Sequence, residues 1–143
     1  MPKRNLDPDK IIDDLFEWAR QYGVAAGALR SINAVSPKTH VRGQWVELAL
    51  KTYLAACKIY MEGHDLAMLA TDCKTNGMTI TKDDETLVIE PLNKKYFRDD
   101  VQDWDFATRY PQEDRGTTVW LMPGHDQVAD FVKRVLDQAS ACR

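Results

Sequence analysis

The segment from Gly43 to Leu69 constrains the fold more than any other part of the chain, and it reads GQWVELALKTYLAACKIYMEGHDLAML. Its first part is apolar apart from charges that recur at helical spacings, namely Glu47, Lys51, Lys58 and Glu62. These spacings place the charges on one narrow stripe of a helix whose remaining circumference is apolar. We therefore predict a helix in the middle of a bundle, over about residues 39–62, with Gly63 as its C-cap.

The whole sequence is typical of one globular domain over residues 1–143, with 44% hydrophobic and 29% charged residues. The net charge of -3 argues against bulk attraction to nucleic acid or membranes, although it allows a local basic patch. Three cysteines without close spacing indicate a reducing compartment rather than a disulfide framework. No apolar run is long enough to span a membrane, and the N-terminus lacks an apolar signal region. We expect a cytoplasmic protein.

Three further helices are predicted around the central one. A first helix should begin at Asp7-Pro8 and stop near Ala34, because Ser36-Pro37 is a turn signal. Gly23 and Gly27 should let a second helix approach it closely. A short third helix is expected over about 65–75, burying Leu66, Leu69, Ala70 and Cys73. The last helix is expected over about 125–140, with a buried stripe of Val128, Phe131 or Val132, Val135 and Ala139.

Residues 78–97 have two interpretations. Thr81 and Asp84 resemble a capping box and favour a helix kinked at Pro91, whose core face would carry Leu87, Leu92 and Tyr96 with Val88 or Ile89. The β-branched runs 78–81 and 86–89 also fit a β-hairpin, and we favour the helix. The predicted fold is an all-α, antiparallel up-and-down bundle of four or five helices. A long ordered loop, about residues 98–123, precedes the last helix.

Three short motifs lie in a suggestive order. They are Ala49-Leu50-Lys51-Thr52-Tyr53-Leu54, Gly63-His64-Asp65-Leu66 followed by Leu69, and Thr108-Arg109-Tyr110-Pro111 after a helix that ends at Tyr96. This arrangement resembles the HEPN family (higher eukaryotes and prokaryotes nucleotide-binding domain) over roughly residues 10–140. The family's Ala-rich helix, His-Asp-Leu helix start and Arg-Tyr-Pro segment correspond to these motifs.

The resemblance implies a small helical bundle that commonly forms a homodimer and binds a nucleotide or RNA. It also implies a partnership with a minimal nucleotidyltransferase, in a toxin-antitoxin or defence module. Ribonuclease members of the family carry an Arg-x4-6-His pattern, which none of His40, His64 and His125 completes. Enzymatic activity is therefore left open, and the alternatives are a non-catalytic homodimeric scaffold and a divergent ribonuclease that uses Arg109 with His125.

The candidate nucleotide- or phosphate-binding residues are Lys51, His64, Asp65, Arg109 and Tyr110. Each also has a structural interpretation. Lys51 can pair with Glu47 one helical turn away, Asp65 can cap a helix, and Arg109 can pair with a nearby aspartate while Tyr110 packs on the bundle.

Three other groups of residues also have a functional and a structural interpretation. Lys38, His40 and Arg42 form a basic connector that can touch a phosphate or simply be solvated. Trp45, Trp104 and Trp120 would mark a partner surface if they are exposed. The spacing of Cys57, His64 and Cys73 fits no metal site, and we expect no metal or other cofactor.

Overall fold

The computed structural model describes residues 7–97 and 122–143, and their regular structure is entirely helical. The elements are α1 (Pro8–Ala28), α2 (Val35–Ala56), α3 (Leu66–Thr75), the π-helical segment η1 (Asp84–Ile89), α4 (Glu90–Tyr96) and α6 (His125–Cys142). The all-helical bundle predicted from the sequence is confirmed. Most of the predicted loop at 98–123 lies outside the described residues.

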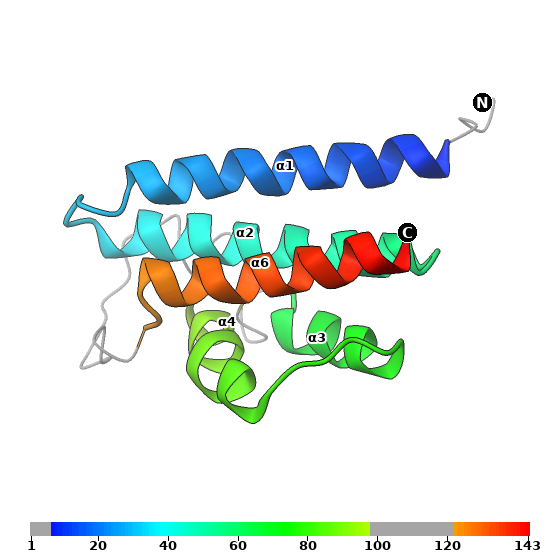
Figure 1. Cartoon of the computed structure of the whole chain (residues 1–143). Coiled ribbons are helices and arrows are strands. Elements are labelled where there is room, and N and C mark those ends of the chain that lie inside the picture. Colours follow the sequence, from blue (N-terminus) through cyan, green and yellow to red (C-terminus); the bar gives the residue numbers. More distant parts are fainter. Residues whose placement is uncertain (1–6, 98–121) are drawn as a thin grey trace.

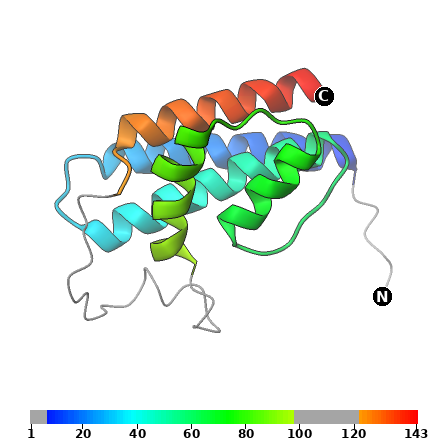
Figure 2. The ribbon, with the colours of Figure 1, turned by 90° about the horizontal axis from the view of Figure 1, so that it is seen from below.

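Helix α2 occupies the centre of the bundle and contacts α1, α3, α4 and α6. Figure 1 shows α1 antiparallel to α2 on one side, with α6 lying along α2 in the same direction as α2. Helices α3 and α4 cover the opposite side, and the view from below shows α4 crossing under α2 beside α3 (Figure 2). The central helix predicted from the apolar segment is therefore present, and thirteen of its residues are buried.

Helix α1 begins as predicted, because the Asp7 side chain accepts a hydrogen bond from the Asp9 N–H and Pro8 takes the first helical position. It ends at Ala28, so the predicted end near Ala34 was wrong. Pro37 does not mark a turn between helices. It lies in the first turn of α2, where the N–H that proline lacks would have no helical partner.

Helix α2 ends at Ala56, so the predicted extension to residue 62 and the C-cap at Gly63 were wrong. The N–H of Ile59 donates to Leu54 O and that of Lys58 to Ala55 O, which is the hydrogen-bond pattern of a Schellman motif. Lys58 takes the left-handed position that glycine usually fills, with φ of 66°. Lys58 therefore lies outside the helix, and the predicted charge stripe is broken after Lys51.

The close approach predicted at Gly23 is confirmed. A Cβ atom there would lie 3.0 Å from the Trp45 ring, so the absence of a side chain at Gly23 allows α1 to pack closely against the indole. Trp45 is buried, and its ring stacks on His125 with centroids 5.6 Å apart. Trp45 therefore belongs to the core and not to an exposed partner surface, whereas Trp104 and Trp120 lie outside the described residues.

The segment after α3 is helical, so the favoured interpretation over the hairpin is confirmed. The capping box is formed: the Thr81 N–H donates to Asp84 Oδ2, and the Asp84 N–H donates to Thr81 Oγ1, each at 3.0 Å. Leu87 is exposed, against the prediction that it faces the core. The buried apolar side chains of η1 and α4 are those of Val88, Ile89, Leu92 and Tyr96.

The predictions for α3 and α6 agree closely with the structure. Both helices bury every residue that was assigned to their core faces. Within residues 7–97 and 122–143, no helix is long and apolar enough to cross a membrane.

Candidate functional site

A buried carboxylate, that of Glu47 on α2, holds three polar side chains together. Glu47 is 4% exposed. Its Oε1 accepts a hydrogen bond from the Tyr96 hydroxyl at 2.9 Å and lies 2.7 Å from Nδ1 of His64. Its Oε2 lies 3.4 Å from the Lys51 ammonium. These three partners come from α4, from the connection between α2 and α3, and from α2 itself, so the fold assembles the cluster.

Helical spacing explains why the residues of α2 in this cluster lie together. His40, Gly43, Glu47 and Lys51 recur at intervals of three or four residues, so they share one face of the helix. Gly43 makes room for the ring of Tyr96, because a Cβ atom at that position would lie 2.3 Å from the ring. The same ring lies 5.9 Å, between centroids, from the imidazole of His40.

Burial of Glu47 would be costly without partners, since an unpaired charge in the interior loses its hydration. Its hydrogen bonds replace that hydration and fix the orientations of Lys51 and His64. Both partners reach the surface: the side chain of His64 is 31% exposed and that of Lys51 is 18% exposed. An ordered ammonium group and an imidazole backed by a carboxylate can bind an anionic group or move a proton.

The structure brings together two of the five predicted site residues, Lys51 and His64. Lys51 pairs with Glu47, which was the structural interpretation of this residue. The same carboxylate also contacts His64. Arg109 and Tyr110 lie outside the described residues.

Asp65 has a structural role instead. Its Oδ1 accepts hydrogen bonds from the N–H groups of Ala67 and Met68 at the start of α3, and from the side-chain amide of Asn93. The Asn93 oxygen in turn accepts from the Leu66 N–H, so the two side chains together cap α3 and tie it to α4.

Sequence reasoning missed Glu47 and Tyr96 as site residues. The signal for Glu47 was available, because it interrupts the apolar run Trp45-Val46 and Leu48-Ala49, where a charge is expected to be paired. The position of Tyr96 depends on where α4 crosses α2, which no local pattern in the sequence specifies.

A second polar group lies where α6 begins. Arg42 donates to the carbonyl of Pro123 at 3.2 Å, and Arg30 pairs with Asp126 at 3.0 Å. Burial, together with the positive charges of Arg30 and Arg42, lowers the pKa of His125. The predicted basic connector does not act as one unit, because His40 lies against Tyr96 while Arg42 reaches Pro123.

The described ranges contain no group of three or more histidine, cysteine or acidic side chains placed to hold a metal ion. Comparison of the chain with protein-family models, curated proteins and solved structures found no match in any of the three.

Proposed function

We propose that this chain is a HEPN-like protein that binds a nucleotide or RNA, and that Lys51 and His64 make its phosphate contact. The observation that carries the proposal is that both side chains contact the same buried carboxylate, Glu47. One residue comes from each of two motifs on which the family resemblance rests. A shared anchor of this kind orients two phosphate partners before a ligand arrives, which lowers the entropic cost of binding.

The Lys51 ammonium group is the positive charge that the cluster offers to a ligand. Binding of a phosphate should therefore depend on Lys51. It should weaken with added salt, as expected for contacts to a phosphate backbone. Arg109 and Tyr110 complete the proposal, as a guanidinium for phosphate and a ring for base stacking.

The direct test is fluorescence anisotropy with a labelled single-stranded RNA, followed by competition with mononucleotides. Lys51→Ala and His64→Ala should each weaken binding by about tenfold, the loss expected for one charge-assisted hydrogen bond. Lys82→Ala is the matched control, because Lys82 is exposed and lies outside the cluster. Equal affinities for the wild type and both cluster variants would reject this site.

The proposal assigns no ribonuclease activity, because the Arg-x4-6-His pattern is absent. Incubation of the purified protein with total RNA tests the divergent alternative that pairs Arg109 with His125. Cleavage that disappears in Arg109→Ala would favour that alternative, whereas intact RNA would support a binding role. A minimal nucleotidyltransferase is the protein partner that the resemblance suggests, and co-purification with such an enzyme would test it.

A homodimeric scaffold is the second candidate, and one observation favours it. Two apolar side chains of α1 are largely exposed, Trp18 at 52% and Val24 at 63%. Tryptophan is enriched in protein–protein interfaces, so the exposed Trp18 favours a second copy as its partner. Light scattering should then give twice the mass of the chain, and Trp18→Ser should shift the protein towards a monomer. A dimer that binds no RNA would favour this candidate over the first.

A further inference from the structure

Two cysteines that are far apart in the sequence lie at the same end of the bundle. Cys57 is the C-cap of α2, and Cys142 is the last residue of α6. Helices α2 and α6 pack against each other and run in the same direction, and their C-terminal ends lie side by side in both Figure 1 and Figure 2. The arrangement of the two helices therefore brings the two thiols into one region.

Helical spacing places both cysteines on buried faces of their helices. Cys142 follows Ala139 by one helical turn and Val135 by two, and both of those residues are buried, so Cys142 continues the inner face of α6. Cys57 follows the buried Tyr53 by one helical turn. The two thiols thus extend the packed faces of α2 and α6 at the point where these helices end.

The two thiols interact with each other and with the hydroxyl of Tyr53. Burial raises the pKa of the Cys57 thiol, a hydrogen bond with Tyr53 lowers it, and the Cys142 thiol raises it again. Burial likewise raises the pKa of Tyr53, and hydrogen bonds with both thiols raise it further. The Tyr53 hydroxyl also donates to Asn76 O at 2.8 Å, which fixes its position. Two thiols at hydrogen-bonding range can form a disulfide by a change of side-chain rotamer.

The three cysteines differ in how easily a reagent reaches them. Cys142 is exposed, Cys57 is partly buried and Cys73 is buried. The Cys73 thiol donates to Leu50 O at 3.4 Å, and burial raises its pKa to about 12, so it is expected to be inert. An exposed thiol reacts first with an oxidant, and a partly buried thiol beside it is placed for the second step.

Arg143 holds the end of α6 in place. Its guanidinium pairs with the Asp13 carboxylate and donates to the carbonyl oxygen of Asp9, so α6 is tied to the first turns of α1. Helix α1 is antiparallel to α2, so these turns lie at the same end of the bundle as Cys57 (Figure 1). The anchor keeps Cys142 beside α2, where a free chain end would fray.

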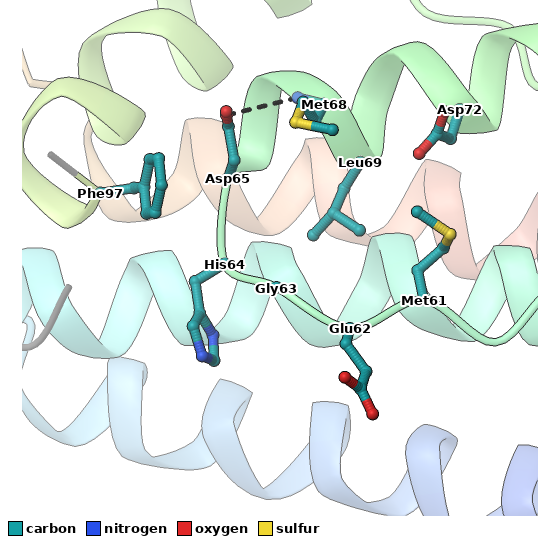
Figure 3. Close-up of a pocket in the computed structure, with 9 residues that line it drawn as sticks. All are labelled: Met61, Glu62, Gly63, His64, Asp65, Met68, Leu69, Asp72 and Phe97. Atoms are coloured by element: carbon teal, nitrogen blue, oxygen red, sulfur yellow. Dashed lines mark hydrogen bonds between the residues drawn. The ribbon is translucent and has the colours of Figure 1, made fainter. Parts of the chain in front are cut away.

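The thiol pair is separate from the proposed phosphate contact. The connection that follows Cys57 leads to His64, whose ring points away from α3 in Figure 3 and contacts Glu47. None of the described residues that line the pocket drawn in that figure is a cysteine. Chemistry at Cys57 and Cys142 therefore needs neither Lys51 nor His64, and it goes beyond the proposed function.

We infer that Cys57 and Cys142 form a reversible disulfide by exchange with a small-molecule disulfide such as oxidised glutathione. The Cys142 sulfur attacks one sulfur of the oxidant, whose S–S bond breaks, and the first glutathione leaves as a thiol with the proton of Cys142. The Cys57 sulfur then attacks the Cys142 sulfur, and the second glutathione leaves with the proton of Cys57. Two protein thiols are oxidised and one oxidant disulfide is reduced to two thiols. The new bond joins the C-terminal ends of α2 and α6.

Equilibration of the full chain in glutathione redox buffers, followed by alkylation of the denatured chain and mass spectrometry, tests this inference. The wild type should keep one alkylatable thiol of its three and should link the peptides of Cys57 and Cys142. At a fixed level of reduced glutathione, the folded protein should need at least about tenfold less oxidised glutathione than the protein in urea. The fold holds the two thiols together, whereas the unfolded chain must first close a long loop. Oxidation should also raise the thermal midpoint by roughly 5–10 °C.

Three cysteine variants sharpen the test. Cys73→Ala is the matched control and should keep the linkage, because this thiol is buried elsewhere in the core. Cys57→Ser should stop at a mixed disulfide between Cys142 and glutathione, and Cys142→Ser should form no internal disulfide.

Three results would overturn the inference: three alkylatable thiols in the folded wild type in every buffer, a disulfide that joins two molecules or includes Cys73, or equal oxidation of the folded and the urea-unfolded chain. The comparison with urea uses the wild type alone, so the test stays decisive even if a cysteine variant does not fold.

Discussion

The ring of Tyr96 lies directly on the backbone of α2 at Gly43, where a Cβ atom would come within 2.3 Å of ring atom Cδ2. This contact sets how closely α4 can approach the central helix. It also places the Tyr96 hydroxyl 2.9 Å from Glu47 Oε1. One missing side chain on α2 is thus a condition for assembling the polar cluster.

Gly43→Ala should therefore destabilise the fold. Both residues are buried, so the added methyl group forces the ring or the helix to move, at a cost of about 1–3 kcal/mol in the free energy of unfolding. Urea denaturation followed by circular dichroism measures this change. Gly27→Ala is the control, because Gly27 is exposed in α1 and a Cβ atom there would meet its nearest neighbour only at 4.0 Å. That variant should gain up to about 1 kcal/mol from helix propensity, and equal effects of the two changes would contradict the packing argument.

Tyr96→Phe separates the hydrogen bond from the packing of the ring. The ring still fits against Gly43, but Glu47 loses a donor in a buried site. We expect the free energy of unfolding to fall by about 1.5–3 kcal/mol, the range for hydrogen bonds to charged groups. The matched change is Tyr60→Phe, because Tyr60 is 51% exposed, and it should alter stability by less than about 0.5 kcal/mol. Indistinguishable denaturation midpoints for the two variants would show that Glu47 does not depend on this donor.

For the central helix, the sequence predicted the buried position but not the C-terminal end. The apolar run from Trp45 to Ala56 predicted a buried helix, and the structure confirms it. That helix ends where Lys58 adopts a left-handed backbone conformation. Helix ends of this kind are predicted from glycine, because lysine rarely adopts that conformation, so the sequence did not indicate an end at this position. The predicted end at Gly63 was wrong for this reason, although Gly63 itself also has a positive φ.

The candidate site was predictable in part. Lys51 and His64 were identified by motif, and Glu47 was identified as the helical partner of Lys51. The sequence did not predict that His64 contacts Glu47, or that Glu47 is buried. Both features depend on the path of residues 57–65 across α2, which is a tertiary property. Asp65 illustrates the opposite case. A helix cap is a local feature, so the structural interpretation available from the sequence alone was the correct one.

Low pH should lower the free energy of unfolding by protonating the Asp84 carboxylate. Hydrogen bonding to Arg134 lowers the pKa of the Asp84 carboxyl, and this effect outweighs burial, which raises it. The folded pKa is thus below the unfolded one. The contribution to stability is present above the unfolded value, near pH 4, and is lost as the pH falls through the folded pKa.

Asp84→Asn should therefore lower the thermal midpoint at pH 7 and flatten its decline below about pH 4. Thermal unfolding between neutral and strongly acidic pH measures both effects. Asp83→Asn serves as the control, because Asp83 is exposed and its side chain makes no capping hydrogen bond. A wild-type and an Asp84→Asn curve that remain parallel down to the lowest pH would contradict the assignment.

His125 should titrate below the ordinary histidine range. Burial lowers its pKa first, and the positive charges of Arg30 and Arg42 lower it further. A folded pKa below the unfolded value of about 6.5 means that this residue favours the fold above that pH. Its contribution is then lost as the pH falls towards the folded pKa.

NMR titration of the imidazole protons, assigned with His125→Gln, measures the pKa of His125 directly. Arg30→Met should raise the pKa of His125, because it removes a nearby positive charge, whereas Lys10→Met near the other end of α1 should leave it unchanged. A His125 pKa at or above 6.5 in the wild type would show that burial and the two arginines do not control this imidazole.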